Sequence, residues 1–264
     1  METDKKDRYV LVTGASAGIG YELCKQFAKD YHNLILVSRD GERLARVAEE
    51  LRTHYRVKTK VISKDLSVSS AATEIYQVLS QESIVVEILV NNAGFNVYGS
   101  FSETDLSREL EMIQLNLVSL VQLTKLFLPE MIKNRSGKIL NVGSTGSYVP
   151  GPLNAVYCAT KAFVRSFSEA LGEEMLGSGV TVTTLCPGAT DTEFAKRAQI
   201  ENIRLFQGRK MTAEAVAKIG YQALMGGKRT VIAGIENKLQ VFSTHFASNS
   251  MVTRMVKKAM TRVS

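Results

Sequence analysis

Short apolar runs alternate with longer segments of helical period along nearly the whole chain, and this alternation limits the fold more than any other feature. The runs are rich in Val, Ile and Leu, which is typical of strands covered on both faces, as in a parallel sheet. Repeated alternation of strand and helix predicts an α/β fold with a doubly wound parallel sheet of about seven strands flanked by helices. The expected strands are 9–13, 34–38, 57–62, 87–91, 138–142, 180–186 and 230–233, and the expected helices are 19–29, 42–52, 71–79, 108–133, 156–176 and 213–225.

We expect a single domain over residues 1–264, because no Pro-, Gly- or Ser-rich linker divides the chain and no repeat of fixed period is present. Its core should span about 8–235, followed by a helical C-terminal tail over about 236–264. A chain of this length can bury a sizeable core in one α/β domain.

Cysteine usage and hydropathy favour a cytoplasmic protein. Cys24, Cys158 and Cys186 are odd in number and widely spaced, which indicates reduced thiols rather than a disulfide framework. The charged start of the chain is not that of an ordinary signal peptide. The most apolar stretch, 110–132, contains Gln, Asn and Lys side chains, so we expect a buried helix there and no transmembrane segment. The histidines are scattered, and no metal site is expected.

The net charge of +7 comes partly from the tail, at Arg254, Lys257, Lys258 and Arg262. The simplest interpretation is a solvated helix face, and peripheral attachment to a membrane is the alternative. We expect no nucleic-acid partner.

A glycine-rich turn directly follows the first expected strand. Gly14, Gly18 and Gly20 have the spacing Gly-x-x-x-Gly-x-Gly and lead into a helical segment. Glycines let the backbone turn tightly and approach a diphosphate, and the helix then presents unpaired N–H groups and its dipole to that anion. The order of strand, turn and helix favours a dinucleotide site over a merely structural turn.

The end of the second expected strand predicts which dinucleotide binds. Dinucleotide folds often place a carboxylate there for the adenosine ribose, but this chain has Ser38 followed by Arg39. An arginine can pair with a 2′-phosphate through two parallel hydrogen bonds, which favours NADP(H) over NAD(H) without excluding NAD(H). The alternative is that Arg39 is a surface residue and Asp40 reaches the ribose.

Two further polar segments follow strands at the same edge of the sheet. Asp65-Leu66 comes after the third strand, where a carboxylate could accept a hydrogen bond from the adenine amino group, and Asn91-Asn-Ala-Gly94 ends the fourth. Ligands of such sheets bind at the carboxyl ends of the strands, so these segments should converge.

Tyr157 and Lys161 lie four residues apart on an expected helix, so both side chains can point into one site. A cation beside a phenol favours the phenolate and lowers its pKa, which suits general acid–base catalysis near neutral pH. Taken alone, the spacing is equally typical of a solvated helix face.

Residues 8–235 contain a set of motifs in a fixed order: Thr13-Gly-x-x-x-Gly-x-Gly20, Asn91-Asn-Ala-Gly94, Asn116, Ser144, Tyr157-x-x-x-Lys161 and Pro187-Gly188 through Thr192. In this order, the motifs resemble those of the short-chain dehydrogenase/reductase family. The resemblance implies a Rossmann-type fold, hydride transfer between a nicotinamide cofactor and a substrate, and a homodimer or homotetramer. The overall likeness and the Ser-Arg pair are most similar to NADP-preferring carbonyl and ketone reductases.

The resemblance implies a catalytic tetrad. Tyr157 would exchange the proton with the substrate oxygen, and Ser144 would hydrogen-bond the same oxygen and stabilise its developing charge. Lys161 would hold the nicotinamide ribose and Asn116 would position a water linking Lys161 to solvent. The cofactor residues it implies are Gly14, Ser16, Gly18, Ile19, Gly20, Ser38, Arg39, Asp65, Leu66, Asn92, Ala93, Gly94, Tyr157, Lys161, Pro187, Gly188, Thr190 and Thr192, with Thr192 at the carboxamide.

One position departs from the family pattern. NADP-preferring relatives often carry a basic residue inside the glycine loop, where this chain has Ala17, so the preference rests on Arg39 with help from Arg43.

The expected substrate is an apolar or aromatic ketone or aldehyde, because Phe95, Tyr98, Tyr148 and Phe194 flank the expected site. The alternatives are an alcohol, steroid or 3-oxoacyl-thioester dehydrogenase/reductase with the same tetrad, and a non-catalytic NADP-binding regulator.

Overall fold

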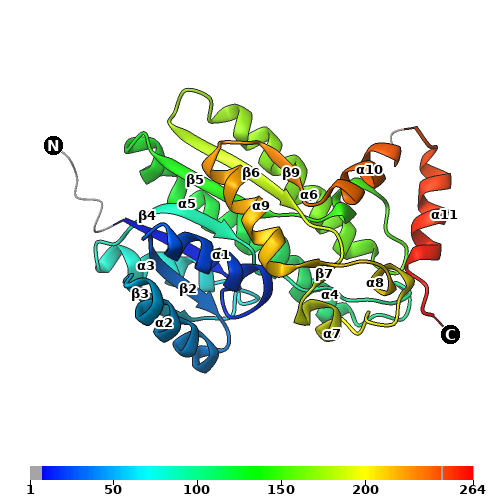
Figure 1. The fold of residues 1–264 in the computed structure, drawn as a ribbon, viewed down its shortest axis with the longest axis horizontal. Coiled ribbons are helices and arrows are strands. Elements are labelled where there is room, and N and C mark those ends of the chain that lie inside the picture. The colour runs from blue at the N-terminus through cyan, green and yellow to red at the C-terminus, as the bar shows by residue number, and fades with distance from the viewer. Residues whose placement is uncertain (1–7, 245, 264) are drawn as a thin grey trace.

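A seven-stranded parallel sheet with helices on both faces forms the protein (Figure 1). The computed structural model describes residues 8–244 and 246–263. The strand order is β3-β2-β1-β4-β5-β6-β9, so the direction of winding reverses between β1 and β4. The strands are β1 (Arg8–Thr13), β2 (Asn33–Ser38), β3 (Thr59–Ser63), β4 (Val85–Asn91), β5 (Gly137–Val142), β6 (Val180–Cys186) and β9 (Thr230–Ile232). This confirms the expected doubly wound α/β fold.

Two apolar layers cover the sheet because alternate residues of each buried strand point to opposite faces. On one face, Val10 and Val12 pack with α1 (Gly18–Lys29), α2 (Gly41–Tyr55) and α9 (Ala213–Met225). On the other face, Leu11 packs with α3 (Ala71–Gln81), α5 (Ser119–Lys133) and α6 (Ala155–Glu174). Figure 1 shows α1 and α9 in front of the sheet and α5 and α6 behind it.

Most of the expected elements are confirmed to within two residues. The largest difference is in the helix expected at 42–52, which ends three residues later, at Tyr55. The third strand, expected at 57–62, begins two residues later than predicted and is Thr59–Ser63. The helix expected at 156–176 ends at Glu174.

The segment expected as one helix over 108–133 is a continuous helical stretch of three parts. They are α4 (Leu106–Ile113), a π-helical segment η2 (Gln114–Val118) and α5. The stretch Leu106–Lys133 is the one helix among residues 8–244 and 246–263 with the length and composition to cross a membrane. Leu123, Phe127 and Met131 of α5 pack into the core, as expected for the core helix of an α/β domain.

The segment after β6 contains short elements that the sequence did not predict. They are β7 (Thr190–Asp191), α7 (Glu193–Arg197), α8 (Arg204–Gln207) and β8 (Met211–Thr212), and β7 pairs with β8. The expected helical tail consists of α10 (Ile235–Thr244) and α11 (Asn249–Ala259). Both tail helices lie at the end of the molecule where β5, β6 and β9 finish (Figure 1).

Candidate active site

The glycine turn after β1 has no room for side chains. Gly14 and Gly18 have φ angles of +67° and +57°, which glycine adopts without strain. A Cβ on Gly20 would lie 2.3 Å from the Gly14 carbonyl oxygen and 2.4 Å from Asn92 Nδ2. The backbone therefore forms a close cradle at the N-terminus of α1, as expected for a site that accepts a diphosphate.

The ends of β1 and β4 are tied together at this cradle. The Thr13 hydroxyl accepts hydrogen bonds from the backbone N–H groups of Asn92 and Ala93, at 2.9 and 3.0 Å. Asn92 in turn donates its amide to the Thr13 carbonyl at 2.9 Å. These bonds fix Asn92 and Ala93 beside the glycine turn, where the sequence placed them.

Ser38 and Arg39, which were expected to contact the adenosine ribose, meet Asp65 at the ends of β2 and β3. The Ser38 hydroxyl is buried without a hydrogen-bond partner among the described residues. Arg39 lies 3.6 Å from the Asp65 carboxylate, which also accepts hydrogen bonds from the Ser67 hydroxyl and backbone. Burial opposes ionisation, but the bonds from Ser67 and the charge of Arg39 lower the pKa of Asp65. The orphaned hydroxyl and the exposed guanidinium fit a phosphorylated adenosine ribose.

Arg43 makes a different contact from the one expected. Its guanidinium forms two hydrogen bonds with the Glu193 carboxylate in α7, at 2.7 and 2.9 Å. Arg197 contacts the same carboxylate at 2.6 Å. The hydrogen bond from Arg43 is the largest cause that lowers the pKa of Glu193 to about 2. Arg43 is therefore held by α7 and does not stand beside Arg39 as a free second cation.

Three other expected cofactor residues lie in the apolar core, beside it, or in the glycine turn. Leu66 packs in the core, Ile19 packs partly against the opposite core layer, and Ser16 is a partly exposed residue of the turn.

Tyr157 lies in the first turn of α6 and faces Ser144, which follows β5. Burial raises the pKa of the Tyr157 phenol, and the neighbouring Ser144 hydroxyl, which favours ionisation, has the smaller effect. The sequence predicted a lowered pKa from Lys161, and in this structure that expectation is wrong. Lys161 Nζ is 5.8 Å from the centre of the Tyr157 ring, and burial of the phenol, not this ammonium, sets the direction of the shift.

Lys161 is itself deeply buried, with 5% of its surface exposed. Its ammonium donates a hydrogen bond to the Val142 carbonyl at 2.9 Å. Burial lowers its pKa to about 8, and the nearby Cys186 opposes this. The side chain is therefore aimed under the end of β5 and held beside Tyr157.

Asn116 lies in the π-helical segment, next to Lys161. A Cβ on Gly94 would be 2.9 Å from Asn116 Oδ1 and 3.5 Å from Lys161 Nζ. The Asn116 side chain also exchanges two hydrogen bonds with the Phe95 backbone, at 3.0 and 2.9 Å. Its amide is thus satisfied by the loop after β4, and a water relay would have to use other atoms of this segment. Such π-helical segments often occur at functional sites.

Ser147 is a residue of this site that sequence reasoning missed. Its hydroxyl accepts a hydrogen bond from the Ser144 backbone at 3.2 Å and donates one to the Lys161 carbonyl at 2.7 Å. It therefore fixes the turn that carries Ser144 against the helix that carries Tyr157 and Lys161. A serine three residues after Ser144 gives no local signal of this role.

The segment after β6 closes the site from the other side. A Cβ on Gly18 would lie 3.2 Å from the Thr192 methyl, so Thr192 stands beside the glycine turn as expected. The Thr190 hydroxyl bonds the Gly188 carbonyl at 3.0 Å. Gly188, which follows Pro187, leaves space that Asn237 of α10 fills, since a Cβ there would be 2.3 Å from Asn237 Oδ1. Asn237 was also missed by sequence reasoning.

An apolar cluster stands next to Tyr157. The Phe194 and Tyr157 rings are 5.9 Å apart, and Phe194 and Tyr98 belong to a cluster with α8 and the end of α11. The Tyr98 hydroxyl donates to the Met260 carbonyl at 2.6 Å. The other two aromatic residues expected here instead pack under arginines, Phe95 under Arg108 and Tyr148 under Arg165. Tyr98 and Phe194 thus remain the aromatic candidates for contact with a substrate.

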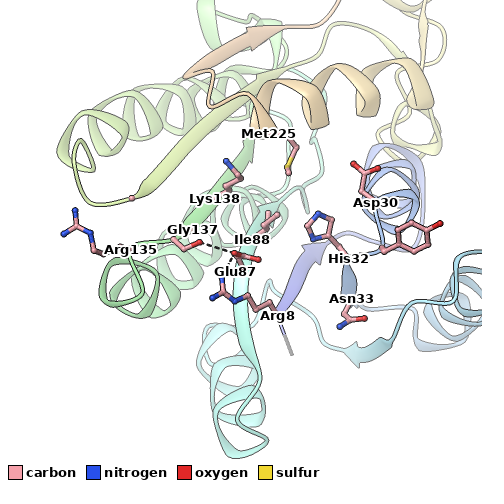
Figure 2. Close-up of a pocket in the computed structure, with 13 residues that line it drawn as sticks. Arg8, Asp30, His32, Asn33, Glu87, Ile88, Arg135, Gly137, Lys138 and Met225 are labelled. Atoms are coloured by element: carbon pink, nitrogen blue, oxygen red, sulfur yellow. Dashed lines mark hydrogen bonds and ion pairs between the residues drawn. The ribbon is translucent and has the colours of Figure 1, made fainter. Parts of the chain in front are cut away.

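A cavity of about 560 Å³ lies on the side of the sheet opposite the candidate active site, near the amino ends of β1, β4 and β5 (Figure 2). Arg8 and Glu87 form an ion pair of 2.7 Å in its wall. It contains none of the residues of the candidate active site.

Comparisons with known proteins agree with this geometry. The short chain dehydrogenase family model matches residues 8–202. An uncharacterized oxidoreductase from Staphylococcus epidermidis is 31% identical over 202 residues, covering 74% of this chain and 86% of that protein. A very-long-chain 3-oxoacyl-CoA reductase from Coprinopsis cinerea is 37% identical over 182 residues, which are 67% of this chain but 53% of the reductase. The structure of a short-chain dehydrogenase from Sphingobium yanoikuyae in complex with NADPH has a TM-score of 0.83 and 29% identity, and the match covers 92% of this chain and 94% of that one.

Proposed function

Since the chain belongs to the short-chain dehydrogenase/reductase family of oxidoreductases, we propose that it reduces the carbonyl group of an apolar substrate with NADPH. The observation that carries this proposal is the convergence of Ser144, Tyr157 and Lys161 beside the apolar cluster that contains Phe194. A pure nucleotide-binding regulator has no need of a partly buried phenol beside a serine and a lysine.

The bound cofactor supplies the hydride, and the protein supplies orientation and a proton. The raised pKa of Tyr157 keeps the phenol protonated at neutral pH, which is the form that donates a proton to a carbonyl oxygen. Ser144 stabilises negative charge on that oxygen by hydrogen bonding. Lys161, with a pKa of about 8, is mainly charged at pH 7 and stands where it can hold a ribose hydroxyl.

The preference for NADPH is supported by Ser38 and Arg39 at the end of β2. The exposed Arg39 guanidinium can pair with a 2′-phosphate, and the buried Ser38 hydroxyl has an unused hydrogen-bonding capacity. Asp65 competes for Arg39, so the preference should be strong but not absolute. The similar dehydrogenase from Sphingobium yanoikuyae was solved with NADPH, which also supports this assignment.

The apolar cluster supports substrates with an apolar body next to the carbonyl. A 3-oxoacyl thioester is a second candidate, because the similar reductase from Coprinopsis cinerea is named for a very-long-chain 3-oxoacyl-CoA. Assembly as a homodimer or homotetramer and a cytoplasmic location complete the proposal. The location is supported by three free, buried cysteines.

The test is oxidation of NADPH by the purified protein with a panel of carbonyl compounds. The panel should contain aromatic ketones, 3-oxoacyl thioesters of increasing chain length and small charged keto acids. We expect kcat/KM to rise with the apolar area of the substrate. Turnover of only the charged keto acids would contradict the apolar site, and tight binding of NADPH without any turnover would favour the regulator. Phe194→Ala provides the matched variant, since it should weaken the preference for apolar substrates and leave NADPH binding unchanged.

A further inference from the structure

The two tail helices carry an unusual share of the exposed apolar surface. Seven of the seventeen large apolar side chains that are exposed among the described residues lie between 235 and 263. Four of them, Ile235, Leu239, Phe242 and Phe246, are 62% to 77% exposed. The first three are spaced by four and three residues and so lie along one face of α10. Phe246 follows the helix, and its ring lies 5.0 Å from that of Phe242.

The opposite face of α10 is fixed to the protein. Val241 is buried, and Asn237 fills the space above Gly188 while donating to the Ala233 carbonyl at 2.6 Å. The apolar face of α10 therefore points outward because the other face is anchored. Exposed apolar faces of this kind mark interaction surfaces.

The charge of the same segment distinguishes between partners. Lys238 lies on α10, and Arg254, Lys257, Lys258 and Arg262 lie on or just after α11, all exposed. Glu236 is the only acidic residue between 235 and 263, and it is 3.6 Å from Arg209. Apposing two copies of this surface would bring like charges together, whereas a surface of anionic phosphates would neutralise them.

Met251 and Met255 of α11 are also exposed, and they alternate with the basic residues along that helix. Val252 and Met260 on its other side are buried. Apolar side chains next to lysine and arginine are typical of helices that lie in a membrane interface.

We propose that α10 and α11 form a docking surface for an anionic lipid bilayer. Leu239 and Phe242 enter the boundary between headgroups and acyl chains, and Lys257 and Lys258 pair with lipid phosphates. The end of the tail is joined to the segment that carries the apolar cluster of the active site. The Thr261 carbonyl accepts a hydrogen bond from the Arg204 backbone N–H at 3.0 Å, and the Val263 backbone N–H donates one to the Asn202 carbonyl at 2.8 Å. Docking would thus place the apolar cluster near the source of lipophilic molecules.

The experiment is co-sedimentation of the full chain with vesicles of phosphatidylcholine, with and without phosphatidylglycerol. We expect binding to the vesicles that contain phosphatidylglycerol, and weaker binding at higher salt. Leu239→Glu with Phe242→Glu, and separately Lys257→Glu with Lys258→Glu, should each reduce vesicle binding about tenfold or more. Phe101→Glu and Leu176→Glu are matched controls, because these exposed apolar residues lie outside the tail and should not change vesicle binding.

Circular dichroism and light scattering on the same variants complete the test. Equal binding of wild type to both kinds of vesicle would overturn the proposal. So would variants that change the oligomeric state but not vesicle binding, since the surface would then be an interface between copies. None of these readouts depends on turnover, so failure of the reductase assignment and failure of the docking surface are distinguishable.

Discussion

Replacing Lys161 with methionine should make the nucleotide-free protein more stable at neutral pH, although the same change should abolish its activity. Burial lowers the Lys161 pKa from the ordinary value of 10.5 to about 8. At 1.36 kcal/mol for each pKa unit, keeping this ammonium inside the folded protein costs about 3 kcal/mol at pH 7. Methionine has a similar length and carries no charge.

One loss opposes this gain. The ammonium donates to the Val142 carbonyl at 2.9 Å, and leaving that oxygen without a partner costs about 1–3 kcal/mol. The net stabilisation by Lys161→Met at pH 7 should therefore be about 0–2 kcal/mol.

The pH dependence of the difference gives the sharper test. Because the folded pKa lies below the unfolded one, the unfolded chain binds more protons between pH 8 and 10.5, and wild-type stability rises with pH in that window. The advantage of Lys161→Met should shrink by about 2–3 kcal/mol between pH 7 and pH 10.

Urea unfolding of both proteins across this pH range measures the effect. Lys133→Met, at the exposed end of α5, is the control and should show a small difference from wild type that does not change with pH. A pH-independent difference for Lys161→Met as well would refute the assignment of a strongly lowered pKa to this buried lysine.

Three further predictions concern the cofactor. Arg39→Ala should raise the KM for NADPH about tenfold or more while leaving the KM for NADH nearly unchanged, and equal effects would exclude Arg39 as the 2′-phosphate contact. Glu193→Gln should release Arg43 and lower the KM for NADPH a few-fold in the same steady-state assay, and an unchanged KM would show that Arg43 is too far from the phosphate. Gly20→Ala places a Cβ 2.3 Å from the Gly14 oxygen, so isothermal titration should show NADPH affinity reduced by about 100-fold, and normal affinity would contradict the cradle.

The regular part of the fold could be predicted because local sequence determines it. Strands such as β1 and β2 are nearly continuous runs of buried apolar residues, and the pattern marks both of their ends to within one residue. The strand at the edge of the sheet, β3, contains Lys60 and exposed Val61 instead, so apolar content placed its start too early. The π-helical segment could not be predicted, because one extra residue in a turn leaves the apolar period almost unchanged.

The segment between β6 and α9 shows where sequence patterns stop being informative. Its short helices and strands are too brief for a period, and tertiary contacts hold them, such as the pair between Arg43 and Glu193. Residues that position the catalytic side chains could not be predicted either. Ser147 and Asn237 act through neighbours that only the completed fold brings together.

Residue identity did predict the pair at the centre of the site. Tyr157 and Lys161 share a helix face, and Ser144 and Asn116 lie close by, as the motifs indicated. The direction of the Tyr157 pKa could not be predicted, because it depends on how much water the folded protein excludes from the phenol. Burial decides it, and the sequence pattern does not report burial at a single atom.

The most direct test of the central assignment is the rate of carbonyl reduction by Tyr157→Phe compared with wild type. This change removes the hydroxyl and keeps the ring that packs beside Phe194. With a substrate from the apolar panel, kcat/KM should fall by about 10²–10⁴-fold. The dissociation constant of NADPH should change little, which shows that the site remains folded. Equal turnover by the two proteins would contradict the role of Tyr157 as the proton donor.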